Sequence, residues 1–129
     1  MEYMYPAILK KHEDGTYFVR IIDLDVMTQG MDLQNAIHMA EDVICLRLIE
    51  LQDNNQKLPN PTGIFSIDCD KHEVSTLVIA DPDLYRKKQS TLTVKKNCTV
   101  QAWLCAEAEK AGINFSAALQ RGLKEELGI

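Results

Sequence analysis

The start of the chain alternates short apolar runs with polar turn sequences. Residues 3–11 (YMYPAILKK) and 16–22 (TYFVRII) are rich in β-branched and aromatic residues, and the segment HEDG between them ends at Gly15. This arrangement predicts a β-hairpin. We expect a short third strand at 26–29, which Gly30 stops.

Helical periodicity begins directly after this third strand. Asp32 is the expected N-cap. The apolar residues that then recur every three or four positions are Leu33, Ala36, Ile37, Ala40, Ile44, Leu48 and Leu51. The prolines at 59 and 61 cannot continue a helix, so the helix is expected to end near Asp53.

The middle of the chain predicts one further strand and a linker. Residues 75–80 (STLVIA) indicate a strand, and 64–67 indicate a weaker one. Residues 81–83 (DPD) are expected to start a short helical turn, with 85–91 (YRKKQST) as the linker. The order strand, strand, strand, helix, strand predicts an α+β fold in which one helix lies across one sheet.

The end of the chain has its own pattern. Residues 94–100 (VKKNCTV) predict a short strand, 101–111 a helix that ends at Gly112, and Asn114 the N-cap of a final helix. A segment of this size cannot bury a useful core alone, so we expect a homodimer or a higher oligomer. The predicted domains are therefore 1–88 and 89–129.

The expected strand at 94–100 has one polar face, because side chains alternate across a strand. Lys95, Asn97 and Thr99 share that face, and these residue types hydrogen-bond to base edges. Paired with its twin, such a strand makes a ribbon that fits the major groove. The predicted DNA contacts are Lys95, Lys96, Asn97, Thr99, Asn114 and Ser116, and the predicted dimer core is Cys98, Val100, Leu104, Phe115, Leu119 and Leu123. From the pattern alone, the polar face and the Asn cap can equally be ordinary solvent-exposed features.

Charge divides the chain in the same place. The net charge is −5, but residues 1–88 hold nine Lys/Arg and fifteen Asp/Glu, whereas 89–129 hold five and four. An acidic body favours a basic protein partner, and Glu41, Asp42 and Glu50 on the predicted helix are candidate contacts. No apolar run is long enough to cross a bilayer and the start lacks a signal-peptide pattern, so we expect a cytoplasmic protein without a membrane partner.

Candidate chemistry is sparse. The four cysteines contain no CxxC pair, and Cys69 with His72 gives only one half of a zinc pattern, so we expect reduced thiols, no metal and no cofactor. Asp23 and Asp25 share one side of an extended segment, and Asp68 and Asp70 repeat the spacing. Brought together, four such carboxylates are what a two-metal nuclease needs, although spaced aspartates are also common turn formers. The histidines accompany no nucleophile motif: they are His12, His38 and His72.

These motifs resemble the HicB antitoxin family. Trp103-Leu104 and the INFS of 113–116 stand where the ribbon-helix-helix tail of that family has them, whereas Gln101 replaces the usual proline. The front half keeps the family's order in Tyr5-Pro6-Ala7, Asp14-Gly15-x-Tyr17, Asp23, Thr28-Gln29-Gly30 and Pro59/Pro61. The family's Pro-Asp-Leu-Pro-Gly stretch is only partly kept, as IDLDV at 22–26.

The resemblance implies a function for each half. It implies an N-terminal domain similar to a truncated RNase H fold that masks a small basic HicA-like toxin, an mRNA interferase. It implies a C-terminal ribbon-helix-helix domain that binds double-stranded operator DNA and represses the shared operon. The protein would then be an antitoxin and not an enzyme. Two alternatives stay open: an orphan HicB-like regulator without a toxin, and a metal-dependent nuclease in the RNase H-like domain.

Overall fold

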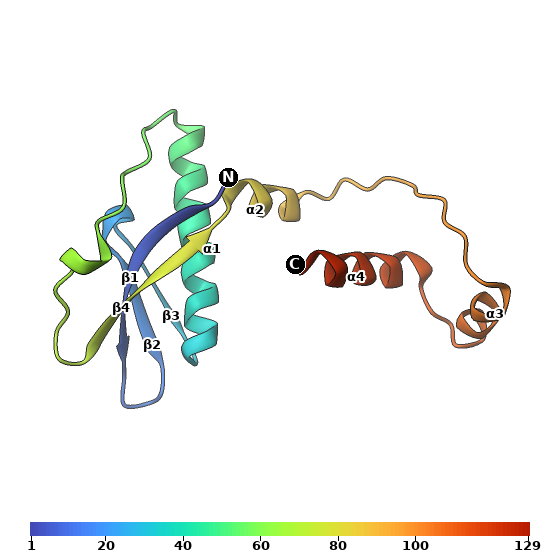
Figure 1. The fold of residues 1–129 in the computed structure, drawn as a ribbon, viewed down its shortest axis with the longest axis horizontal. Helices are drawn as coiled ribbons and strands as arrows, with labels where there is room; N and C mark the ends of the chain where they lie inside the picture. Colours follow the sequence, from blue (N-terminus) through green and yellow to red (C-terminus); the bar gives the residue numbers. More distant parts are fainter. The chain divides into compact units, whose positions relative to one another are not determined.

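The computed structural model describes residues 1–129 as two compact units, Met1–Thr91 and Leu92–Ile129 (Figure 1). The first unit contains a four-stranded antiparallel sheet and most of the secondary structure. The second contains two helices and an extended segment. No helix of the chain combines the length and the apolar character needed to span a bilayer.

The sheet of the first unit has the strand order β3-β2-β1-β4. Its strands are β1 (Tyr3–Lys11), β2 (Tyr17–Ile21), β3 (Val26–Gly30) and β4 (Glu73–Ala80). The predicted hairpin is confirmed: β1 pairs with β2, and Gly15 takes the positive φ of 88° that the turn between them requires. The strand predicted at 75–80 is also confirmed, and it pairs with β1 along its whole length as the edge strand.

Helix α1 (Leu33–Asp53) lies across one face of this sheet, as the periodicity predicts (Figure 1). Asp32 caps it, because its Oδ1 accepts a hydrogen bond of 2.8 Å from the backbone N–H of Asn35. The largest side chains buried between sheet and helix are Tyr5, Leu9, Val19, Ile21, Ile44, Leu48 and Val78. The opposite face of the sheet carries no helix, and Met4, Leu77 and Ile79 are exposed there.

Gly30 allows α1 to approach the sheet closely. A Cβ atom at this position would lie 2.4 Å from the backbone nitrogen of Ala36 and 2.5 Å from its Cα. These are backbone atoms of the first turn of α1 and cannot rotate away. Gly30 is therefore the last residue of a strand and also the contact point of strand and helix.

The weak strand predicted at 64–67 is wrong. The chain forms a short 3₁₀ helix there instead, η2 (Ile64–Ser66); another, η1 (Ile22–Leu24), lies between β2 and β3. Side-chain hydrogen bonds fix the long connection before β4. The hydroxyl of Tyr5 donates to the carbonyl of Pro59 at 2.6 Å. The hydroxyl and the backbone N–H of Thr62 donate to the carboxylate of Asp23 at 2.6 and 3.1 Å. These bonds tie the connection to β1 and η1, and residues 64–67 pair with no strand.

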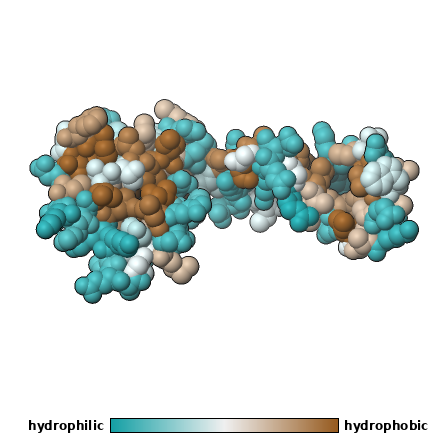
Figure 2. Space-filling model, turned by 60° about the horizontal axis from the view of Figure 1, so that its bottom comes forward, coloured by the Kyte–Doolittle hydropathy of each residue, from teal (hydrophilic) through white to brown (hydrophobic).

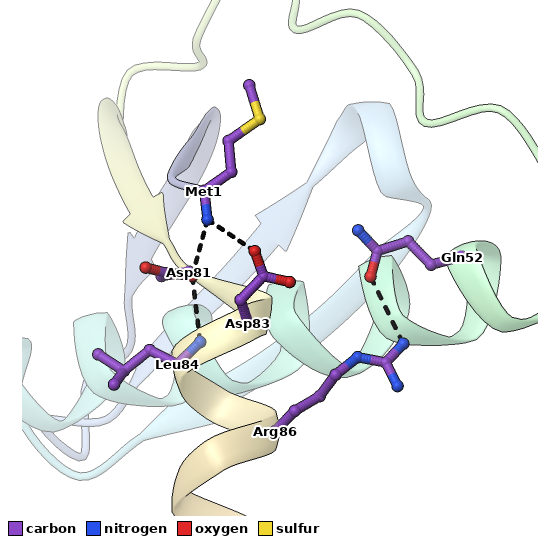
Figure 3. Close-up of polar contacts among 6 residues, drawn as sticks. All are labelled: Met1, Gln52, Asp81, Asp83, Leu84 and Arg86. Atoms are coloured by element: carbon purple, nitrogen blue, oxygen red, sulfur yellow. Dashed lines mark hydrogen bonds and ion pairs between the residues drawn. The ribbon is translucent and has the colours of Figure 1, made fainter.

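The linker predicted at 85–91 is also wrong, because most of it is helical. Helix α2 (Pro82–Gln89) begins with Asp81, whose Oδ1 accepts from the backbone N–H of Leu84 at 3.1 Å, and a proline in its first turn (Figure 3). Tyr85 packs against the core. Arg86 joins Asp53 of α1 at 2.7 Å. Because of these contacts, the short helical turn expected at 81–83 continues as a helix to Gln89.

The second unit consists of α3 (Ala102–Lys110) and α4 (Phe115–Leu127), at the positions that the pattern predicts. Gly112 ends the first with a φ of 68°, and Asn114 caps the second by accepting from the N–H of Ala117 at 3.1 Å. The strand expected at 94–100 is absent from the single chain. A strand exists only through ladder hydrogen bonds to a neighbour, and no other segment of the chain pairs with this one.

Candidate nucleic-acid and partner interfaces

The predicted base-reading residues lie on the extended segment that precedes α3. Lys95, Asn97 and Thr99 are all exposed there, together with Lys96. The structure thus leaves the whole set accessible to a ligand. Their alignment on one face depends on strand geometry, which the segment does not have without a partner.

The two predicted phosphate contacts at the start of α4, Asn114 and Ser116, differ in whether the side chain is already used within the helix. Asn114 uses its side-chain oxygen to cap its own helix, which is the ordinary role of an Asn at this position. Ser116 lies in the first turn and is exposed. Their common location is a helix N-terminus, where free backbone N–H groups and the helix dipole favour an anion.

The predicted dimer core is uncovered in the single chain. Val100, Leu104, Phe115, Leu119 and Leu123 are each between 41% and 54% exposed, and Cys98 is exposed as well. No residue of α3 or α4 is buried. Apolar atoms at the surface of this unit are visible in Figure 2. A folded unit without any buried residue needs another surface to cover it.

Further exposed apolar residues extend this surface beyond the predicted set. They are Leu92, Val94, Trp103, Ile113 and Leu127. Trp103 holds a defined orientation, because its Nε1–H donates to Oε1 of Gln101 at 3.1 Å. Helical spacing of apolar residues predicts Phe115, Leu119 and Leu123 of this set. Periodicity does not predict Trp103 as part of this surface, because a single aromatic residue has no spacing of its own.

Two of the three acids considered for a protein partner meet in one groove. Glu41 and Asp42 line a hollow of about 370 Å³ beside α1, α2 and the end of β4, together with Glu2 and Asp81. Cys45 lies in its lining, and burial raises the pKa of this thiol to about 11, with the carboxylates of Asp42 and Glu41 adding to the effect. Glu50 lies elsewhere and pairs with Arg47 at 2.9 Å.

Of the carboxylates considered for a nuclease, Asp23 takes a structural role instead. Asp23 lies in η1 and accepts both hydrogen bonds from Thr62, and Asp25 follows with a left-handed φ of 52°. The expectation that they share one side of an extended segment is therefore wrong. No group of three or more His, Cys, Asp or Glu side chains in the chain is arranged to hold a metal ion.

Comparisons with known proteins give no match to a family model and no match among curated proteins. Two solved structures match nearly the whole chain. A chain of a toxin–antitoxin complex from Streptococcus pneumoniae is 22% identical, with a TM-score of 0.61, covering 98% of this chain and 99% of that one. The antitoxin HicB of Burkholderia pseudomallei is 16% identical, with a TM-score of 0.53, covering 97% and 96%. The chain has the fold of these proteins.

Proposed function

We propose that this protein, which has the fold of the HicB antitoxin, is itself an antitoxin of that family. The first unit is the truncated RNase H-like domain that masks a small basic toxin, an mRNA interferase of the HicA type. The second unit is one half of a ribbon-helix-helix domain that binds operator DNA as a homodimer. The observation that carries the proposal is the second unit, which displays its apolar residues and a basic segment without any core.

Dimerisation completes this unit in two ways. Pairing of residues 94–100 with the same residues of a second copy would satisfy their backbone groups and place Lys95, Asn97 and Thr99 on one face of a ribbon. The same pairing would bring Leu104, Phe115 and Leu119 against their counterparts. One association thus covers the exposed apolar surface and forms the face that reads bases.

Charge supports a basic protein as partner of the first unit. Residues 1–88 carry a net charge of −6, and Glu41 and Asp42 are unpaired by any cation at the groove beside α1 and α2. Complementary charge accelerates encounter and suppresses wrong partners. One of the structures with this fold was solved as a toxin–antitoxin complex.

Base readout is tested on the operator of the protein's own gene. Asn97→Ala should cost about 1–3 kcal/mol of binding free energy and relax base choice at one position, because Asn reads adenine through two hydrogen bonds. Lys95→Ala should have a similar cost. Asn60→Ala, at an exposed site in the other unit, is the matched control. Gel-shift titrations in which all three variants bind like the parent would show that the ribbon assignment is wrong.

Toxin masking is tested by co-expression with the adjacent gene. A small basic product should be toxic alone, harmless with this protein, and should copurify with it in a sized complex. Glu41→Gln with Asp42→Asn should weaken that complex, whereas Glu50→Gln should not. A protein that represses its operon but has no toxic neighbour would be an orphan regulator with the same DNA-binding unit.

A further inference from the structure

The stretch of chain that joins the two units contains more basic residues than the two lysines of the proposed ribbon. Residues 84–106 carry five basic side chains and no carboxylate, in a chain of net charge −5. The ribbon uses Lys95 and Lys96. The remaining three, Arg86, Lys87 and Lys88, lie in the last turn of α2, which belongs to the first unit.

Only two of these three cations are available to a ligand. Arg86 holds α2 against α1: its Nη2 lies 2.7 Å from Asp53 and 3.5 Å from the side-chain oxygen of Gln52, and Figure 3 shows it reaching across to that helix. Lys87 and Lys88 are exposed and form no ion pair. Lys88 borders the groove that contains Glu41 and Asp42, yet it lies beyond ion-pair distance of both.

We propose that Lys87 and Lys88 bind phosphates of the DNA backbone beside the operator bases, a contact that rests on the DNA binding proposed above. Lys95 follows Lys88 by seven residues, which span at most about 25 Å when extended. Duplex DNA carries a charge about every 1.7 Å of its axis, so phosphates lie within reach of both lysines while the ribbon occupies the groove.

Lys87 and Lys88 would also reduce the electrostatic repulsion between DNA and the acidic rest of the first unit. Residues 1–85 hold six basic and fifteen acidic side chains, a net charge of −9. A body of that charge is repelled by DNA. Lys87 and Lys88 lie on the helix that precedes the DNA-binding unit in the chain, and their charge offsets part of this repulsion. Phosphate groups are the ligand that the two exposed ammonium groups themselves favour.

The test compares two double variants of the full-length protein. Lys87→Gln/Lys88→Gln removes the proposed contacts. Lys10→Gln/Lys11→Gln removes the same charge from the exposed end of β1 in the same unit. Binding to the operator duplex and to an unrelated duplex is measured by fluorescence anisotropy between about 50 and 200 mM salt.

We expect only the first variant to change the salt dependence. Each lost phosphate contact lowers the slope of log K against log salt by about 0.9, so a dimer that loses four should change it by up to about 3.6. The loss should be equal on both duplexes, because phosphate contacts carry no sequence information. Lys87→Arg/Lys88→Arg should keep the parental slope, because a phosphate contact needs the positive charge and Arg retains it.

Three results would overturn the inference. The first is equal slopes for the Lys87/Lys88 and Lys10/Lys11 variants with parental operator binding, which leaves the proposed function intact. The second is a loss confined to the operator duplex. The third is a parent protein that binds no duplex at any salt concentration, in which case the proposed DNA binding fails as well. Melting curves of both variants show whether the loss of last-turn cations has unfolded α2.

Discussion

The two units of this chain use similar local devices with opposite results. In both, an Asx side chain caps a helix, Asp32 for α1 and Asn114 for α4, and each helix has apolar residues at helical spacing. In the first unit the apolar face meets a four-stranded sheet, and Ile44 and Leu48 are fully buried. In the second unit nothing opposes that face, and Leu119 and Leu123 remain exposed. Helix formation is therefore a local property in both units, whereas a core needs a second layer.

The difference also concerns what each unit can recognise. The first unit completes its own structure, so its exposed features, an acidic groove and an open sheet face, are free to bind another protein. The second unit buries no residue of its two helices, and we propose that a second copy of itself covers them. The burial thus distinguishes a unit that forms its own core from one that buries none of its helical residues.

The largest expected effect is on the close contact of β3 and α1. Gly30→Val places atoms on the backbone of Ala36 and should destabilise the first unit by at least about 4 kcal/mol, which is exceptional for one substitution. Gly63→Ala is the control, because its Cβ would meet only the Ser66 hydroxyl at 3.5 Å. Urea unfolding followed by circular dichroism measures both. Equal stability of the two variants would mean that the helix is not packed as described.

The next effect separates the buried and exposed sides of α1. Leu48→Ala should cost about 2–5 kcal/mol through lost burial and a cavity. Leu46→Ala, two residues earlier and 53% exposed, should change stability by no more than about 0.5 kcal/mol. The same unfolding experiment reports both values. A smaller cost at Leu48 than at Leu46 would contradict the assignment of the core face.

The third effect concerns association and not the unfolding of the first unit. Leu119→Ala should raise the dissociation constant of the homodimer by about 10- to 100-fold, equal to about 1–3 kcal/mol. The melting of the first unit should stay unchanged. Gln120→Ala, the exposed neighbour on the same helix, is the control. Sedimentation over a range of concentrations measures the dimer, and a parent protein that stays monomeric throughout would contradict the comparison of the two units.

The smallest expected effect is an increase in stability. Gly122 lies inside α4 with open space around its position, so Gly122→Ala should stabilise the helix by about 0.5–1 kcal/mol. Circular dichroism of the full chain measures the change in helix content and melting. A clear loss of dimer in this variant would place the backbone of the second copy against Gly122, as only a close approach makes the added methyl group unfavourable.

Much of the secondary structure could be predicted because its signals are local. The spacing of apolar residues and the cap at Asp32 place α1 at its observed bounds, and Gly15 and Gly112 mark a turn and a helix end where positive φ is required. The candidate DNA-binding residues around Asn97 depend on the same kind of local pattern, and they stay a prediction. Each of these signals depends on residues within about four positions of one another.

Other features were decided only by contacts between distant segments. Helix α2 extends through the expected linker because Arg86 reaches Asp53, and the connection before β4 forms η2 because Tyr5 and Asp23 hold Pro59 and Thr62. Residues 94–100 are not a strand, since no neighbour within one chain pairs with them. The sequence alone determined which segments are amphipathic and where helices start and stop. The tertiary structure decided which of those faces are covered, because burial and strand pairing depend on surfaces that lie far away along the chain.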